Sequence, residues 1–446
     1  MLTLVLSRGE TMRIRTIAAA VAMAAAGSTA WAAAAPVQSD AQIAARVAKV
    51  LSATPLIDGH NDLPWEVRER YAGKVGGFDL RGDLSQAPPA PGSAPGGLMT
   101  DIPRMRAGHM GGQFWSVYIP ASVTGPAAVK MTLEQIDIVK RLAAKYPADL
   151  AMAYSADDIV RAHKAGQVAS LIGVEGGHQM DDSIAVLRAY YALGARYMTL
   201  SHFTNNHWAD SATDDPAHHG LTAYGKAVVA EMNRLGMLID LSHVSDETMR
   251  DALSVSQAPV IFSHSGARAL SDHPRNVPDD VLALVARNHG VVMANYATGY
   301  VNAVRGRWNA DQSAETAREA ALYQGQPERR KTAMAAWAQA HPKPVTTLAM
   351  VADHIEQIRK VAGIDSVGIG SDLDGIPDTP LGLEGVDKYP ALLAELARRG
   401  WTDEELAKVA GANLLRALRQ AEAVARRLQG VQPNEATLAD LDGAPK

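Results

Sequence analysis

The chain has 446 residues and a net charge of −5, with nearly balanced acidic and basic residues. No basic run is long enough to bind nucleic acid, so the composition argues against a nucleic-acid partner. The chain contains no cysteine, which excludes disulfides, a cysteine-linked lipid anchor and thiolate metal ligands. A metal site would have to use His, Asp and Glu, and this donor set favours zinc or a close relative.

The N-terminus is typical of an export signal. A basic segment, MRIRT from Met12, precedes the Ala-rich stretch IAAAVAMAAAGSTAWAAAA, and the polar PVQSDAQ follows. We expect cleavage near Ala32 to Ala35, so that residues 1–35 are a signal peptide with an overhang before Met12. The apolar stretch is shorter than the ~20 residues that span a membrane. The protein is therefore expected to be exported, periplasmic or secreted, without a stable membrane anchor.

Eight apolar runs rich in β-branched residues, each ending in polar residues, are spaced along the chain. The predicted strands are 55–62, 112–120, 168–178, 195–203, 236–244, 258–265, 290–296 and 366–372. Helical patterns with cap residues lie between several of them, at 183–194, 224–236 and 245–256. Strands that alternate with helices pair in parallel, and eight repeats predict a closed (β/α)8 TIM-like barrel of the α/β class.

Two stretches interrupt this alternation. Residues 85–97 have the composition of a long Pro/Gly loop, and 301–346, after the seventh strand, are predicted to form a mostly helical insertion. We expect a single barrel domain over 36–430, followed by a C-terminal tail at 431–446.

Six of the eight predicted strands end in a histidine or a carboxylate. These residues are His60 and Asp62, Glu175, His202, His243, His264 and Asp372. In an extended strand, side chains two positions apart point to the same side, so His60 and Asp62 can converge on one point. A lone histidine at a strand end is more often a packing residue. However, the carboxyl ends of all barrel strands meet at one face, where active sites of this fold lie, so the repetition predicts a common site.

Competing motifs are incomplete or absent. The segment GIGSDLDG at 368–375 lacks the third glycine of a dinucleotide fingerprint, and its DLDG is too short for an EF-hand. Neither His-Glu-x-x-His nor Gly-x-Ser-x-Gly occurs, which argues against zincin and serine-hydrolase chemistry. The remaining histidines near the motifs are expected in loops, and His178 and His207 are the alternatives for supporting a ligand.

These motifs resemble those of the membrane (renal) dipeptidases, the zinc dipeptidases of the amidohydrolase superfamily. The resemblance runs from about Pro55 to Arg416, in that family's motif order. The motifs are DGHNDLPW, GVEGGH, YMTLSHFTNNHWADS, LGMLIDLSHVS, APVIFSHSGARAL, RNVPDD and VGIGSDLDG. The resemblance implies a barrel of the metal-dependent hydrolase type.

The resemblance also implies two Zn2+ ions per chain. One would be held by His60 and Asp62 and the other by His243 and His264, with Glu175 bridging both. Two zinc ions that share a carboxylate also share a water, whose pKa falls toward ~7 and which becomes a nucleophile at neutral pH.

Further roles follow from the same resemblance. His202 and Asp372 would act in catalysis together with the bridging glutamate, and Asp372 rather than Asp374 would transfer the proton. His202 and Arg275 would bind substrate, and Tyr300, beside an insertion where the relatives are short, could contact it. The alternative for Arg275 is a surface ion pair. Its candidate partners are Asp272, Asp279 and Asp280.

The expected function is hydrolysis of small dipeptides with a free C-terminal carboxylate, which the Arg275 fork suits, and a C-terminal D-residue should be tolerated. The alternatives are an amidohydrolase of N-acyl amino acids or lactams, and a metal-dependent binding protein without turnover. Arg275 and Asp372 argue against the latter, because holding metal requires neither. Unlike the animal members, this chain lacks cysteines for disulfides and a hydrophobic tail for lipid anchoring. A homodimer is possible.

Overall fold

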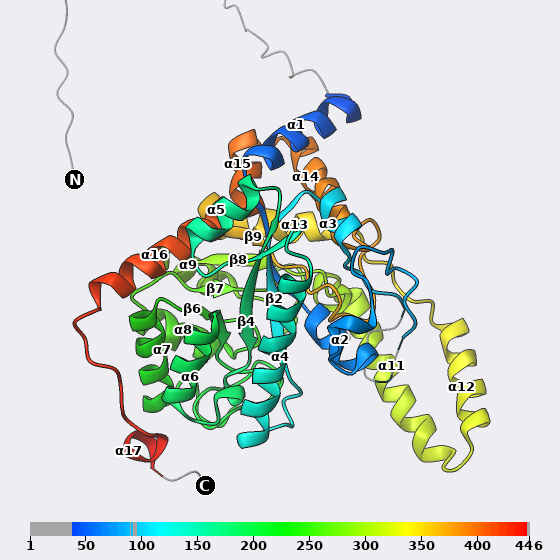
Figure 1. Cartoon of the computed structure of the whole chain (residues 1–446). Coiled ribbons are helices and arrows are strands. Elements are labelled where there is room, and N and C mark those ends of the chain that lie inside the picture. The colour runs from blue at the N-terminus through cyan, green and yellow to red at the C-terminus, as the bar shows by residue number, and fades with distance from the viewer. Residues whose placement is uncertain (1–37, 90, 92–95, 444–446) are drawn as a thin grey trace, which may run out of the picture. The chain divides into compact units, whose positions relative to one another are not determined.

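Eight parallel strands close into a barrel in the computed structural model, which describes residues 38–89, 91 and 96–443 (Figure 1). The strands are β1 (Leu56–Asn61), β2 (Met110–Tyr118), β4 (Val168–Glu175), β5 (Ala195–Thr199), β6 (Leu238–Asp240), β7 (Ile261–Phe262), β8 (Val291–Ala294) and β9 (Val367–Ile369). They follow one another around the ring in this order, and β9 pairs with β1. All eight predicted strands and the (β/α)8 fold are confirmed.

The ring closes between β2 and β4, whose parallel register runs from Gly112 opposite Ala169 to Tyr118 opposite Glu175. A ninth strand, β3 (Leu150–Met152), pairs with the first residues of β4 and is not part of the ring. The sequence prediction missed β3, because three residues are too few to show a period.

Successive residues of the barrel strands belong to two different buried clusters. Ile57, Phe114, Leu171 and Tyr197 belong to the smaller cluster, whereas their direct neighbours, such as Leu56 and Trp115, belong to the larger one. Because successive side chains of a strand point to opposite faces, the smaller cluster fills the barrel and the larger one lies between the wall and the helices. Both faces of the wall are therefore apolar, which explains why the strands appear as continuous apolar runs in the sequence.

Helices surround this wall. They are α1 (Asp40–Ala53), α2 (Leu63–Tyr71), α3 (Ile102–Ala107), α4 (Pro126–Lys145), α5 (Ala156–Lys164), α6 (Ile184–Leu193), α7 (Ala223–Leu235), α8 (Asp246–Val255), α9 (Asp279–Asn288), α13 (Leu348–Ala362), α14 (Tyr389–Arg398), α15 (Asp403–Ala407) and α16 (Asn413–Arg427). The three quoted helical patterns are α6, α7 and α8. Each begins after a cap, Ser183, Thr222 or Ser245, whose side chain accepts a backbone hydrogen bond from the first turn.

The predicted insertion after β8 is helical. It contains α10 (Thr298–Val301), α11 (Ala303–Leu322) and α12 (Pro327–Ala340), and α11 and α12 form a hairpin that extends away from the barrel (Figure 1). No residue of α12 is buried, and Arg305 and Glu319 are the buried residues of α11. The first turns of α11, in contrast, lie close to the barrel's carboxyl face.

The predicted signal segment at 1–35 and part of the Pro/Gly loop at 85–97 lie outside the described residues. The predicted C-terminal tail contains a short helix, α17 (Leu438–Asp442), which packs on α7. Among the described helices, none combines the length and the apolar character needed to cross a membrane.

Candidate metal centre

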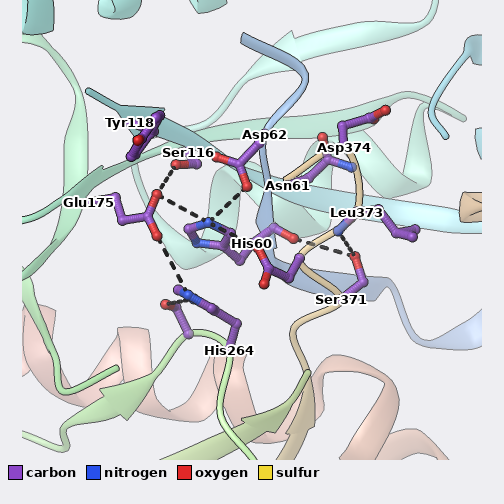
Figure 2. Close-up of polar contacts among 12 residues, drawn as sticks. His60, Asn61, Asp62, Ser116, Tyr118, Glu175, His264, Ser371, Leu373 and Asp374 are labelled. Atoms are coloured by element: carbon purple, nitrogen blue, oxygen red, sulfur yellow. Dashed lines mark hydrogen bonds and ion pairs between the residues drawn. The ribbon is translucent and has the colours of Figure 1, made fainter. Parts of the chain in front are cut away.

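The structure brings all seven strand-end residues together at the carboxyl end of the barrel. Their possible ligand atoms form three overlapping groups, and within each group these atoms lie within 4.8 Å of one another. The groups are His60, Glu175 and His264; Glu175, His202 and His243; and His60, Asp62 and Asp372. Figure 2 shows His60, Asp62, Glu175 and His264 facing a common point.

Glu175 presents its two carboxylate oxygens to two different sets of donors. Its Oε2 lies 3.5 Å from His60 Nε2, and that nitrogen is 3.3 Å from Asp62 Oδ2. Its Oε1 lies 3.2 Å from His243 Nε2 and 3.5 Å from His264 Nε2. The nitrogens of these last two histidines are 2.9 Å apart. Glu175 therefore lies between a His60–Asp62 pair and a His243–His264 pair.

His202 and Asp372 border these pairs. His202 Nε2 lies 3.4 Å from Glu175 Oε1, as close as the two histidines of the second pair. Asp372 Oδ1 lies 3.9 Å from His60 Nε2. At this distance His202 could either bind a metal ion or contact the substrate.

The backbone conformation that brings Asp62 to the cluster differs from the extended strand predicted from the sequence. Strand β1 ends at Asn61, and Asp62 is the N-cap residue of α2, with φ −98° and ψ 19°. Its carboxylate makes no capping hydrogen bond; instead Asn61 Oδ1 accepts a hydrogen bond from the Leu63 backbone N–H at 2.9 Å. His60 and Asp62 meet as expected, but because the chain turns into α2, not because an extended strand continues.

Two of the strand-end residues adopt a strained backbone conformation. His243 has φ 69° and Asp372 has φ 64°, in the left-handed region that non-glycine residues rarely occupy. Backbone hydrogen bonds hold both residues: Ala212 N–H donates to His243 O at 2.7 Å, and Asp372 N–H donates to His60 O at 3.1 Å. Such strain is typical of functional sites, where the surrounding structure compensates for it.

Several residues that the sequence analysis did not identify orient the donors. Tyr197 OH lies 3.0 Å from His60 Nδ1, and Ser263 Oγ lies 2.8 Å from His264 Nδ1. Ser116 Oγ donates to Glu175 Oε2 at 2.9 Å. Hydrogen bonds of this kind fix the ring orientation and tautomer of metal-binding histidines. The contacts of Tyr197 and Ser116 join residues far apart in the sequence and depend on strand pairing, whereas Ser263 directly precedes the histidine that it contacts.

Two of the histidines are held in the neutral form. Burial, reinforced by the positive charge of nearby Arg275, lowers the pKa of His243 and of His264 well below the usual value for histidine. Neutral imidazole is the form that binds a metal ion.

The surroundings of His60 are strongly negative. Burial alone would lower the pKa of His60, but Glu175, Tyr197 and Asp62 raise it well above its usual value. Burial, together with Asp62 and Glu175, raises the pKa of Asp372 well above the usual range. The negative charge that favours a proton on His60 would equally favour a metal cation at that nitrogen.

The donors fit a divalent metal ion. They are imidazole nitrogens and carboxylate oxygens, the ligands that zinc takes in catalytic sites without cysteine. Within the described part of the chain, His60 Nε2 and Asp62 Oδ1 are buried and have no hydrogen-bond partner. Buried polar atoms are rarely left unpaired, and a metal ion in this cluster would satisfy both.

A cleft of about 400 Å³ opens onto the cluster. Arg275 and Tyr300, both expected to contact substrate, line it. Arg275 is 1% exposed; its Nη2 donates to His264 O at 3.2 Å and its Nη1 to Ser265 Oγ at 3.4 Å. The ring of Tyr300 lies 5.6 Å from the guanidinium carbon.

The surface ion pair considered for Arg275 is not present. No carboxylate of the described residues lies within 4.0 Å of its guanidinium, and Asp280 pairs instead with Arg250 at 2.8 Å. A buried cation without an anionic partner is costly. In this position, the carboxylate of a ligand would supply that partner.

The comparisons with known proteins agree with this site. The model of the family described as membrane dipeptidase (peptidase family M19) matches residues 44–432, so the chain belongs to this family. Membership and the donor cluster together support a metal-dependent dipeptidase, which is a hydrolase.

Solved structures share the fold at low sequence identity. The probable dipeptidase PvdM from Pseudomonas aeruginosa is 24% identical, with a TM-score of 0.72 over 86% of this chain and 99% of that chain. Dipeptidase AC, a metallo peptidase of family M19, is 22% identical, with a TM-score of 0.66 over 82% and 98% of the two chains. A metallo peptidase from Rhodobacter sphaeroides, liganded with a phosphinate mimic of the dipeptide L-Ala-D-Ala, is 22% identical, with a TM-score of 0.66 over 82% and 99%.

Proposed function

We propose that the chain is a dipeptidase that uses two zinc ions. One ion would be held by His60 and Asp62 and the other by His243 and His264, with Glu175 bridging them. The observation that carries the proposal is the position of Glu175, whose two oxygens face the two donor pairs at 3.2 to 3.5 Å. A carboxylate between two such pairs could bridge two metal ions that act together on one substrate.

Residues of the chain itself would manage the proton and the developing charge. Two bound divalent ions would supply a nucleophilic water at neutral pH and polarise the scissile carbonyl. Asp372, at the cluster's edge, would accept the proton of the attacking water and return it to the leaving amine. His202 Nε2 would donate a hydrogen bond to the carbonyl oxygen as negative charge develops on it.

Arg275 would select dipeptides by binding the C-terminal carboxylate. Its planar fork suits a carboxylate, and its place beside His264 puts the chain end one residue beyond the scissile bond. A longer peptide would carry its C-terminal carboxylate away from Arg275 and lose this contact. Because a methyl side chain demands little room on either side, a C-terminal D-alanine should be accepted. The dipeptide mimic in the Rhodobacter sphaeroides relative supports this substrate class.

The proposal is tested with purified protein, L-Ala-L-Ala and L-Ala-D-Ala. Release of free alanine should stop after treatment with a chelator and return when Zn2+ is added. His243→Ala should abolish turnover, whereas His219→Ala should not. Both histidines have positive φ, but His219 is exposed and lies outside the cluster, which makes it a matched control.

Two results would contradict the proposal. Turnover that survives removal of all metal would exclude the metal-dependent mechanism. Cleavage of N-acetyl-alanine or a lactam, with no cleavage of either dipeptide, would favour the broader amidohydrolase interpretation.

We also propose that the protein is exported, on the basis of its signal-like N-terminal sequence. N-terminal sequencing of the protein recovered from the periplasm or the medium should then find a start close to Ala35. An N-terminus at Met1 or Met12 on active protein would contradict this.

A further inference from the structure

The helical insertion contributes a side chain to the cleft. Asn309, on the second turn of α11, lines the cleft together with Gly299 and Tyr300 of the α10 region. The side of the cleft that holds Arg275 and Tyr300 thus continues into a helix that the sequence analysis could place only as an insertion.

Two glycines allow α11 to approach this closely. A methyl group added at Gly306 of α11 would lie 2.7 Å from the backbone oxygen of Gly299, and one added at Gly299 would lie 2.6 Å from Asn309 Nδ2. Glycine inside a helix is destabilising relative to alanine, and close backbone contact explains its presence at position 306. Asn309 is three residues further along and therefore on the same face of α11.

Hydrogen bonds fix the orientation of the Asn309 amide. Arg305 Nε donates to Asn309 Oδ1 at 2.8 Å, and because arginine only donates, the oxygen of the amide must face Arg305. Arg305 is held in turn by Asp378, whose oxygens lie 3.0 and 3.1 Å from its Nη2. Asp378 also accepts from Thr298 Oγ1 at 3.0 Å. The Nδ2 group of Asn309 is therefore directed toward Gly299 and the cleft.

We propose that Asn309 and Gly299 form the subsite for the side chain of the substrate's C-terminal residue. The inference rests on the proposed function, because Arg275 locates that residue only if it binds the C-terminal carboxylate. Tyr300 links the carboxylate site to the proposed subsite, because its ring lies next to the Arg275 guanidinium and it directly follows Gly299. A fixed N–H donor in this place selects a small side chain that carries an acceptor, such as that of asparagine.

The test compares kcat/KM for L-Ala-L-Asn, L-Ala-L-Leu and L-Ala-Gly. Asparagine and leucine have nearly the same shape, so their ratio reports the acceptor, and glycine has no side chain to bind. The wild type should prefer the asparagine substrate about 3- to 10-fold over the leucine substrate, the usual worth of one hydrogen bond. Asn309→Leu should remove this preference while leaving L-Ala-Gly within about 2-fold, since the change touches neither metal nor carboxylate.

A matched control and a second variant separate recognition from misfolding. Gln312→Leu, on the same helix but outside the cleft lining, should keep the wild-type preference. Asn309→Asp keeps a partner for Arg305 and replaces the donor with an acceptor. It should therefore favour L-Ala-L-Lys over L-Ala-L-Asn, a ratio that is insensitive to partial loss of active protein.

The outcomes distinguish failure of the Asn309 subsite from failure of the proposed dipeptidase function. If the wild type cleaves L-Ala-Gly but treats the asparagine and leucine substrates equally, the subsite assignment is wrong and the dipeptidase proposal stands. A uniform loss for all three substrates in Asn309→Leu would also overturn the assignment, because it would place Asn309 at the carboxylate. If metal-loaded enzyme cleaves none of the three, the proposed function fails, and the inference with it.

Discussion

Replacing Arg275 with methionine should remove the preference for a free C-terminal carboxylate. Arg275 is 1% exposed and its guanidinium has no carboxylate partner within 4.0 Å among the described residues, so a substrate carboxylate would meet it with little competing water. A hydrogen bond to a charged group contributes about 1.5–3 kcal/mol, so Arg275→Met should lower kcat/KM for L-Ala-L-Ala roughly 10- to 150-fold. Arg275→Lys keeps the positive charge but loses the planar fork, so its kcat/KM should lie between those of the wild type and Arg275→Met.

The assay is a cycle of two enzymes and two substrates, L-Ala-L-Ala and its C-terminal amide. Amidation of the substrate should lower kcat/KM of the wild type by about the same factor as the mutation does, whereas Arg275→Met should hydrolyse the two substrates with nearly equal kcat/KM. Because Arg275 Nη2 also donates to His264 O, metal content and thermal unfolding of each variant must be measured alongside. Equal discrimination against the amide by wild type and Arg275→Met would refute the carboxylate role.

Three further substitutions test the cluster. Asp372→Asn should keep the metal and lose about 10²–10⁴-fold in kcat, the usual worth of a positioned acid–base group; near-normal turnover would reassign the proton to another residue. Ser116→Ala removes the donor to the bridging carboxylate and should cost about 10- to 100-fold in metal affinity or activity, so wild-type zinc binding and kcat would show that this hydrogen bond is dispensable. A methyl group at Gly375 would lie 2.1 Å from Asp62 Oδ2, so Gly375→Ala should displace this carboxylate and lower the metal content. Gly76→Ala is the control, because Gly76 has open space around it, and its metal content should not change. Unchanged metal content in Gly375→Ala would mean that Asp62 is not a ligand.

The barrel and the residues of the cluster could be predicted because their signals are local. Each strand is an apolar run of a few residues, and His60, Glu175 and His264 stand at or just beyond the ends of such runs. The carboxyl ends of parallel strands meet whatever the details of packing. Convergence of these residues therefore required only the correct fold class.

The features that the sequence did not reveal depend on contacts between distant segments. Tyr118 comes to lie opposite Glu175 only through the register of β2 with β4. Asn309 reaches the cleft only because two glycines let α11 approach α10. Even the meeting of His60 and Asp62, which the two-residue spacing anticipated, depends on the turn into α2 and not on strand geometry.

We propose that two metal ions, shared through Glu175, make this barrel a dipeptidase. The most direct test is a titration of metal-free enzyme with Zn2+, in which dipeptide hydrolysis and bound zinc per chain are measured together. We predict that activity rises until two equivalents are bound and then remains constant, and that His264→Ala reaches neither value. Full activity without zinc, or at one equivalent with no further gain, would exclude the two-metal mechanism.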